Sequence, residues 1–335
     1  MSRFQHNDKD FMNIIRNMFV VFIFHSSNAV LAANPSQEGT SLESEQQEML
    51  DIGKSVFAGN VDALTNKAIE SISQEGVGLT KSYLEKYFPT VEVSFDMLDN
   101  NNPTSSLLFL LPLSDPDDIK NTFFTQNSIY YRDNRTTINM GLGYRRLELD
   151  NKLLLGINAF YDHEFPYDHG RTSIGLEART TIGEINFNRY WATTDWKTGE
   201  QDLQEQALGG ADIEIGAPLP YMDWAKLYVR GFTWDAVNGA NNLEGSDISL
   251  RAQVPPLPGL TFEVGHRSYT DSTPDDNFLR ISYNVMELMK EQRSQPLFSQ
   301  TAYSLSSMEN ERFAKVRREN LIVKQTGFTV GIKGF

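Results

Sequence analysis

The chain has 335 residues, of which 40% are hydrophobic and 22% are charged, and its formal net charge is −14 at pH 7. A chain this acidic repels phosphate backbones, which argues against nucleic-acid binding, and its length suffices for one large or two ordinary domains. Cysteine is absent, which excludes disulfides, thiolate metal sites and a cysteine nucleophile and suits an exported protein.

The N-terminus predicts export. Basic residues precede the apolar run Met18–Phe24, and Val30–Ala32 ends in the small residue that signal peptidase requires. We therefore predict a signal peptide over residues 1–32, and translation from Met12 instead of the first methionine would give a more typical one. The alternative is a buried helix of a cytosolic protein. The apolar run, of about seven residues, is too short to span a bilayer, and no later stretch approaches the roughly 18 to 20 apolar residues of a transmembrane helix.

Residues 33–89 are predicted to form a short helical segment. Apolar residues recur at helical spacing between Leu50 and Ile72, which is typical of one or two amphipathic helices. Such helices either pack on another surface or fray as an extension. The pattern ends at Pro89, and from about Val91 apolar residues recur at every second position.

Strand-like runs then follow one another with turn signals between them. The twelve predicted strands are 91–98, 105–114, 124–133, 136–147, 152–162, 172–182, 184–192, 207–217, 225–235, 246–255, 260–268 and 277–286. Their number is even, and most have the roughly nine to twelve residues that cross a membrane at a tilt.

Alternation places the charged residues on one face of each strand. In the run 137–145, Met140 and Leu142 fall on one face, and Asn139 and Arg145 fall on the other. Alternation alone fits both a soluble β-sandwich and a water-filled barrel whose charged face points into the lumen. Twelve strands without intervening helices, aromatic residues near strand ends and a signal peptide favour the barrel. The mean hydropathy of −0.41 is compatible with a barrel, because apolar and polar residues alternate along each membrane strand and the average therefore stays low.

Connection lengths predict the orientation. If the first strand starts in the periplasm, periplasmic connections such as Glu148–Asn151 are short, whereas the opposite set includes the long polar loops 193–206 and 236–245. Short inner turns and long outer loops are typical of outer-membrane barrels. The sequence therefore predicts an all-β fold, a 12-stranded antiparallel transmembrane β-barrel over residues 90–287, with a short N-terminal helical periplasmic segment over 33–89.

Four motifs occur in order between residues 123 and 191: FFTQNSIYYRDNRTTINMGLGYR, LGINAFYDHEF, HGRTSIGLEAR and INFNRYW. Together they resemble the β-domain of the intimin/invasin family of inverse autotransporters. The resemblance covers roughly Lys81 to Val285 and extends weakly to VRRENLIVKQ at Val316 to Gln325. The structural residues of the motif are Arg135, Asn139, Gly141, Gly143, Arg145, Asn158, Phe160, Tyr161, Asp162, Arg171, Gly175 and Glu177.

The resemblance implies an outer-membrane barrel whose N-terminus is periplasmic and whose linker returns through the pore, carrying an adhesive passenger of Ig-like domains. Here residues 288–335 form a C-terminal linker or tail that is expected to thread the pore. Crossing about 30 Å of membrane takes about ten extended residues, and the remainder is too short for an Ig-like domain of about 100 residues. We therefore expect the anchoring half without its adhesive half, and whether a passenger was lost or is supplied separately stays open.

Twelve charged residues are predicted to face the lumen. They are Arg145, Glu177, Arg179, Asp212, Glu214, Lys226, Arg230, Asp247, Arg251, Glu263, Arg267 and Arg280. They either bind a solute, hold the returning linker, or form a hydrated wall in which charges on neighbouring strands pair, which is the favoured interpretation. A carboxylate pair such as Glu177 with Asp162 suits acid–base chemistry, but no spacing indicates a shared pocket. The sequence therefore predicts no catalytic residue, no cofactor and no enzyme.

A cluster of carboxylates and histidines lies within NAFYDHEFPYDHGR at 158–171. His163 and His169 suit a metal ion in principle. The favoured interpretation is a hairpin loop, HEFPYDHG, which is polar because loops are hydrated, and no metal site is predicted. Asp162 and Arg171 flank this loop, and we expect them to fix the hairpin or the barrel rim through a charge-assisted hydrogen bond.

The C-terminal residues predict a short helix near Ser304 to Arg317 and a strand-like run over 321–335. The terminal Phe335 resembles the assembly signal of outer-membrane proteins, but the apolar residues before it alternate on the opposite face of the strand. The run Asn277–Met286 is therefore the better candidate for the strand that closes the barrel.

The leading functional prediction is an outer-membrane anchor and translocator of the intimin/invasin type, with that family's role in surface display and adhesion. Its expected partners are outer-membrane lipid, the barrel-assembly and periplasmic chaperone machinery and, if a passenger exists, a host-cell or surface ligand, with no nucleic acid. The alternative is a passive pore for small solutes, which the charged lumen favours. A secreted soluble β-enzyme is the third hypothesis.

Overall fold

The structure is a computed structural model that describes residues 89–98, 101–253, 255, 259–284, 286–287 and 296–327. The predicted signal peptide, the predicted helices before Pro89 and the terminal Phe335 lie outside the described residues. None of the helices among the described residues has the length and apolar content needed to cross a bilayer.

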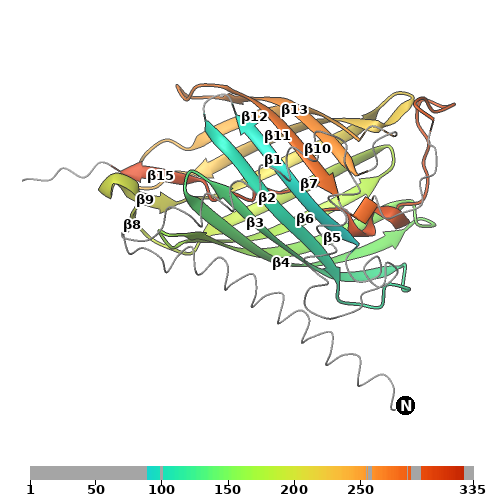
Figure 1. The fold of residues 1–335 in the computed structure, drawn as a ribbon, viewed down its shortest axis with the longest axis horizontal. Coiled ribbons are helices and arrows are strands. Elements are labelled where there is room, and N and C mark those ends of the chain that lie inside the picture. Colours follow the sequence, from blue (N-terminus) through green and yellow to red (C-terminus); the bar gives the residue numbers. More distant parts are fainter. Residues whose placement is uncertain are drawn as a thin grey trace, which may run out of the picture. The chain divides into compact units, whose positions relative to one another are not determined.

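All twelve predicted strands are present. Their bounds are β1 (Thr90–Leu98), β2 (Asn101–Pro112), β3 (Asn121–Arg132), β4 (Arg135–Glu148), β5 (Leu153–Phe165), β6 (His169–Thr180), β7 (Gly183–Ala192), β10 (Gly209–Leu219), β11 (Met222–Asp235), β12 (Leu243–Ala252), β13 (Leu260–Tyr269) and β14 (Asp276–Asn284). Each is antiparallel to its neighbours, and β14 pairs with β1, with Phe95 opposite Ile281, so the sheet closes into a barrel. The predicted twelve-stranded barrel is confirmed, and the closing strand is the one predicted (Figure 1).

The barrel wall follows the alternation read from the sequence. On β4, the Leu142 side chain is 62% exposed on the outside, whereas Asn139 and Arg145 are 0% and 1% exposed on the inside. The same division recurs on β10, where Ile213 and Ile215 are exposed and Asp212 and Glu214 are buried. Because side chains alternate along a strand, one sequence pattern gives each strand an apolar outer face and a polar inner face.

The two ends of the barrel carry different connections. The β2–β3, β4–β5, β6–β7 and β10–β11 connections lie at one end, here called the turn end. At the other, here called the loop end, the β7–β10 connection contains β8 (Lys197–Thr198), the 3₁₀ helix η1 (Glu200–Asp202) and β9 (Gln204–Ala207). These short elements were not predicted. They form a separate three-stranded sheet with β15 (Lys324–Gly327), in the order β15-β9-β8.

The loop predicted at residues 163–170 is wrong in its length. Strands β5 and β6 extend to Phe165 and His169, so only residues 166–168 form the turn. The cause is continued ladder pairing, with His163 opposite Gly170 and Glu164 opposite His169. Glu164 and His169 are polar because they face the lumen, and not because they lie in a loop.

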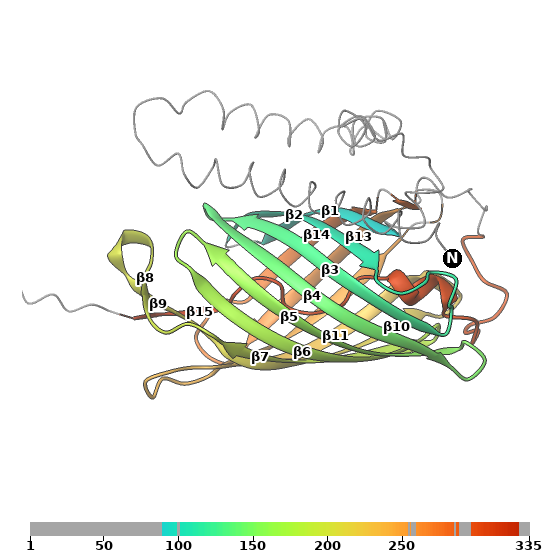
Figure 2. The same cartoon turned by 90° about the horizontal axis from the view of Figure 1, so that it is seen from below.

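The C-terminal residues cross the inside of the barrel. The rim segment, residues 296–308, lies along the turn end and leads into the 3₁₀ helix η2 (Glu309–Phe313). The luminal segment, residues 314–323, then runs through the interior of the barrel to β15 at the loop end (Figure 2). The helix predicted over 304–317 is therefore wrong apart from the five residues of η2, because the barrel wall supplies the backbone partners that a helix would otherwise supply.

Candidate functional site in the barrel lumen

The backbone of the luminal segment is held by side chains of the barrel wall. An extended chain inside a protein has no internal hydrogen bonds, so its peptide groups need other partners. Arg145 donates to the carbonyl oxygens of Arg312 and Ala314 at 2.8 and 2.6 Å. Further donors are Arg179 to Lys315 O (3.1 Å), Asn188 to Arg317 O (3.0 Å), Arg171 to Glu319 O (2.8 Å) and Asn139 to Asn320 O (3.0 Å). The wall therefore fixes the path of this chain in part through its backbone.

The charged side chains of the luminal segment are each paired with the wall. The ion pairs are Lys315 with Glu92 at 2.5 Å, Arg317 with Glu214 and, at 3.4 Å, with Glu263, Arg318 with Asp162 at 2.6 Å, and Glu319 with Arg230 at 3.3 Å. These partners come from β1, β10, β13, β5 and β11. The segment is thus tied to opposite sides of the lumen by consecutive residues.

Asp162 is the most highly connected carboxylate of the site. Arg171 donates to it at 2.9 Å, Asn139 at 2.7 Å, and Arg318 of the luminal segment binds both of its oxygens at 2.9 and 2.6 Å. The side chains of all three charged residues are 0% exposed. Buried charges are stable only when they are paired and hydrogen-bonded, so Asp162 and its two arginines depend on one another.

The predicted hydrogen bond between Asp162 and Arg171 is present. The two residues are opposite one another in the β5–β6 ladder, and the guanidinium of Arg171 lies 4.6 Å above the ring of Tyr190. Sequence reasoning missed that Arg318 joins the pair and that the pair contacts the luminal segment. The adjacent basic residues Arg317 and Arg318 in VRRENLIVKQ were the signal, because inward carboxylates need cationic partners.

Glu177 belongs to a second cluster. Its carboxylate contacts Arg145 at 2.6 Å and Arg179 at 2.7 Å. The carboxylates of Glu177 and Asp162 are thus each held by their own pair of arginines rather than facing a shared substrate pocket.

The glycines of the motif leave room for inward-facing aromatic rings. A Cβ atom on Gly141 would come within 2.1 Å of the Phe160 ring, and one on Gly143 within 2.2 Å of the Phe124 ring. The guanidinium of Arg318 lies 4.3 Å from the centre of Phe160, and that of Arg145 lies 4.6 Å from Phe124. The glycines therefore seat the rings on which the site's arginines stack.

The remaining motif residues divide between two places. Gly175 lies between two amide side chains, and its Cβ position is 2.5 Å from Asn158 and 2.6 Å from Asn188. Tyr161, in contrast, faces outward with 39% of its side chain exposed and contacts His163 at 3.3 Å. Tyr161 is therefore a motif residue outside the luminal site.

An ionic cluster, here called the exit cluster, lies where the chain leaves the barrel. Arg135 contacts Glu164 at 2.9 Å and donates to both oxygens of Glu205 at 2.8 Å, and Lys324 of β15 contacts Glu164 at 2.6 Å. His169 lies 3.3 Å from Glu205. The roles of Glu205 and Lys324 were not predicted, because no sequence signal places β9 beside β15. Those of Glu164 and His169 were not predicted, because both residues were assigned to a hydrated loop.

Burial and charge oppose one another at two groups of the exit cluster. Burial by itself raises the pKa of Glu205, but the hydrogen bonds and charge of Arg135 outweigh it and lower the pKa below its ordinary value of 4.5. Burial lowers the pKa of Lys324 below its ordinary value of 10.5, although Glu164 acts in the opposite direction.

The two histidines considered as metal ligands face different surroundings. His163 contacts Asp168 at 3.2 Å on the exposed side of the barrel, and His169 is fully buried against Glu205. In the part of the chain that the structure describes, no group of three or more His, Asp or Glu side chains is arranged to hold a metal ion.

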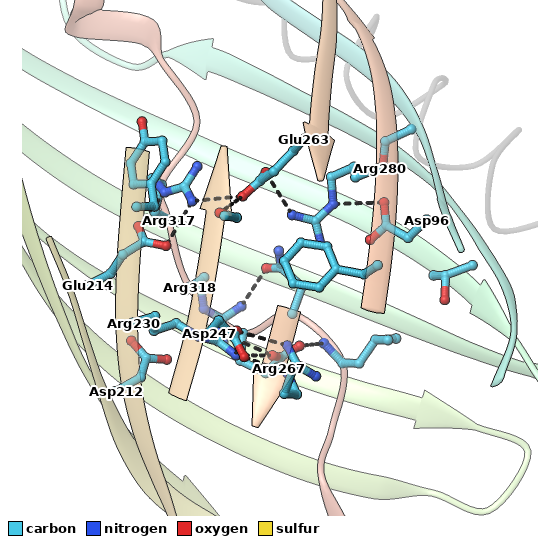
Figure 3. Close-up of a pocket in the computed structure, with 18 of the residues that line it drawn as sticks. Asp96, Asp212, Glu214, Arg230, Asp247, Glu263, Arg267, Arg280, Arg317 and Arg318 are labelled. Atoms are coloured by element: carbon cyan, nitrogen blue, oxygen red, sulfur yellow. Dashed lines mark hydrogen bonds and ion pairs between the residues drawn. The ribbon is translucent and has the colours of Figure 1, made fainter. Parts of the chain in front are cut away.

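A polar cavity of about 130 Å³ lies beside the luminal segment, against β1–β3 and β10–β14 (Figure 3). Charges on its wall pair mostly with one another. Arg280 contacts Asp96 at 2.7 Å and Glu263 at 3.3 Å, while Arg267 and Arg230 both contact Asp247, at 2.8 and 2.9 Å. The predicted pairing between neighbouring strands is therefore present here, and the alternative, holding of the returning chain, is present on this wall as well as on the opposite side.

Comparison with known proteins gives one consistent picture. A family model described as the inverse autotransporter β-domain matches residues 34–320. The chain is similar to Invasin of Yersinia enterocolitica, with 25% identity over 297 residues, which are 85% of this chain and 34% of Invasin. It is also similar to the inverse autotransporter adhesin YeeJ of Escherichia coli (strain K12), with 26% identity over 229 residues, 65% of this chain and 10% of YeeJ.

A solved structure from work on the in-meso crystallization of membrane proteins has a similar fold. It matches with a TM-score of 0.58 and 24% identity, and the match covers 71% of this chain and all of the solved chain. At this identity the likeness concerns the fold alone. The chain spans only a minor part of the length of Invasin and of YeeJ.

Proposed function

The chain belongs to the inverse autotransporter β-domain family and is a barrel of the bacterial outer membrane, and from this premise we propose that it anchors its own C-terminal residues and exports them through the lumen. In this proposal residues 1–32 are the signal peptide, 33–89 a periplasmic helical segment, 90–287 the barrel, and 288–335 the exported linker. The turn end faces the periplasm and the loop end faces outward, in keeping with the longer β7–β10 connection at the loop end.

The observation that carries the proposal is the charge matching of the luminal segment. Lys315, Arg317 and Arg318 meet carboxylates of the wall, and Glu319 meets Arg230. Reversing the direction of the segment or shifting it by one residue would place like charges together. The wall is therefore complementary to this one sequence in this one register, as expected of a barrel that retains its own exported chain.

The motif residues support the same role. Asn139, Arg145 and Arg171 donate to carbonyl oxygens of the C-terminal residues, while Gly141 and Gly143 seat the stacking rings. We propose that the motif is the chain-holding surface of the family rather than a feature of barrel stability alone.

Surface display and adhesion are part of the same proposal. Invasin and the YeeJ adhesin are chains far longer than the part matched here. We propose that any host-cell or surface ligand is bound by residues C-terminal to the barrel. We also propose that barrel-assembly and periplasmic chaperone machinery act on this chain, with β14 as the strand that is recognised, because β14 closes the barrel against β1.

Cysteine labelling tests the export path directly, since the chain contains no cysteine. Thr326→Cys lies on β15 at the loop end, and Ser307→Cys lies in the rim segment at the turn end; both side chains are exposed. A membrane-impermeant maleimide should label Thr326→Cys on intact cells and Ser307→Cys only after the outer membrane is permeabilised. Labelling of Ser307→Cys on intact cells with protection of Thr326→Cys would reverse the orientation and refute the export proposal.

A passive pore is the second candidate, and the cavity beside the luminal segment is the observation that favours it. Planar-bilayer conductance separates the two functions. The intact protein should conduct poorly, and deletion of residues 287–335 should open the barrel. High and steady conductance of the intact protein would favour the pore.

A further inference from the structure

The rim segment forms a continuous belt of backbone contacts along the turn end. Trp224 Nε1 donates to Leu297 O at 2.9 Å, and the main chains of Ser299 and Ala302 pair with Tyr221 at 2.8 and 3.1 Å. Further along, Thr181 exchanges hydrogen bonds with Ser304 and Ser306, and Met308 N donates to Asn151 O at 2.7 Å. The segment is therefore fixed to the β10–β11, β6–β7 and β4–β5 turns in sequence.

This fixed segment exposes large apolar side chains. Phe298 is 67% exposed, Tyr303 is 53% exposed, and Leu297 and Leu305 are each 48% exposed. At the far end of the segment Met308 is instead buried between Leu147 and Leu154. The segment thus has a residue that anchors it to the barrel and a set that faces away from it.

The turns beneath the rim segment add to the same surface. Leu149 is 70% exposed, Ile182 is 42% exposed and Tyr221 is 50% exposed. Leu149 and Tyr221 have φ of 52° and 64°, a left-handed conformation in which glycine, asparagine or aspartate is the usual choice. Bulky apolar residues at strained and exposed turn positions indicate that the side chains themselves meet an apolar partner.

We propose that the rim segment and these turns form an interfacial anchor that lies in the headgroup–acyl boundary of the periplasmic leaflet. This inference rests on the proposed function, because it needs a membrane-embedded barrel whose turn end faces the periplasm. The occupant is lipid because the apolar surface continues into the lipid-facing band of the barrel. Each of the three turns leads within a few residues to an exposed apolar side chain of the outer wall, namely Leu155, Ile185 and Leu227.

The residue types fit this location. Tryptophan and tyrosine are enriched where a barrel meets the membrane interface, and Trp224, Tyr221 and Tyr303 gather here. Polar side chains such as Gln300 alternate with the apolar ones, as in a segment that lies on a membrane rather than across it. Lipid contact would add to the hydrogen bonds that fix the rim segment, and so help to set the point at which the chain turns into the lumen.

Spin labels on single cysteines test this in the full-length protein, reconstituted in vesicles of phosphatidylethanolamine and phosphatidylglycerol. The rim-segment positions are Phe298→Cys and Tyr303→Cys, the polar control in the same segment is the exposed Gln300→Cys, and the control for the lipid-facing wall is Leu142→Cys on β4. Accessibility to oxygen, which enters lipid, is measured against accessibility to a water-soluble nickel chelate. Heat-modifiable gel mobility confirms that each variant has folded.

The expected oxygen-to-nickel ratio is several-fold higher at positions 298 and 303 than at 300, with labels seated about 5–10 Å below the interface. A ratio at 298 and 303 equal to that at 300 would overturn the inference, provided that Leu142→Cys still reports lipid. Protection from both reagents would also overturn it, because protein and not lipid would then cover the surface. If Leu142→Cys itself reports water, the membrane barrel of the proposed function fails, so the two failures are distinguishable.

Discussion

On the β4–β7 side of the lumen, wall side chains mainly bind the backbone of the luminal segment. On the β11–β14 side, Arg230 and Glu263 meet its charged side chains, and the other wall charges bind mainly one another. Asp162 is shared between Arg171 of the wall and Arg318 of the segment, without exposure to solvent. Asp247 is shared between Arg230 and Arg267, both of the wall, beside the polar cavity. The β4–β7 side therefore serves retention of the chain, whereas the β11–β14 side combines retention with the lining of a hydrated space.

The largest expected effect comes from removing the carboxylate of Asp162, on the β4–β7 side of the lumen. Asp162→Asn leaves Arg171 and Arg318 buried without a carboxylate, and losing one partner of a buried ion pair costs about 3–5 kcal/mol. We expect the urea midpoint of the barrel in vesicles to fall strongly and the luminal segment to become sensitive to protease.

The matched control is Asp247→Asn on the cavity side, where water replaces part of the lost interaction. A loss of stability at Asp247→Asn equal to that at Asp162→Asn would remove the distinction between the two sides.

A smaller effect is expected at Gly141, the glycine that leaves room for the Phe160 ring on the β4–β7 side. Gly141→Ala forces the Phe160 ring away from its position under Arg318, and overpacking of this kind costs about 1–3 kcal/mol. Gly231→Ala on β11 is the control, because no atom lies within 4 Å of its Cβ position. Unfolding midpoints of the two variants are compared in the same vesicles. Equal midpoints would mean that Phe160 moves freely and that close packing on this side contributes little.

The two sides of the lumen also differ in how far the sequence could predict them. Alternation along the strands predicted twelve strands, their faces and the closing partner of β1, because a single period-two pattern determines which side each residue takes. The wall pairs around Asp247 could be predicted as well, since opposite charges sit at facing positions such as Asp247 and Arg267. Prediction stopped at contacts that alternation does not determine, namely those between the wall and the luminal segment. Arg318 is 156 positions from Asp162, and nothing in either local pattern specifies the other.

The exit cluster provides a test by pH. The folded-state pKa of Glu205 lies below its ordinary value of 4.5, so its contribution to docking of β15 is present above that value and is lost as the pH falls through the lower folded-state pKa. The groups that face it are Arg135, His169 and Lys324, with Glu164 beyond them. Hydrogen exchange of β9, corrected for intrinsic rates, should accelerate on acidification.

Glu205→Gln supplies the control for this test. It removes the titrating carboxylate, so β9 should exchange faster already at neutral pH, by about 1 kcal/mol of lost protection, and respond less to acid. An unchanged acid response in Glu205→Gln would assign the pH dependence to another group of the exit cluster.

The smallest effect is expected on the cavity side, at Arg267. Arg267→Ala leaves Asp247 paired with Arg230 at 2.9 Å, and the Arg267 side chain is already 23% exposed, so the loss should be about 0.5 kcal/mol. The substitution also removes side-chain atoms from the cavity wall, so single-channel conductance should rise slightly while the luminal segment stays resistant to protease. Protease sensitivity equal to that of Asp162→Asn would mean that the cavity side retains the chain as strongly as the β4–β7 side does. The ion pairs around Asp247 would then contribute to that retention through Arg230 and its contact with Glu319.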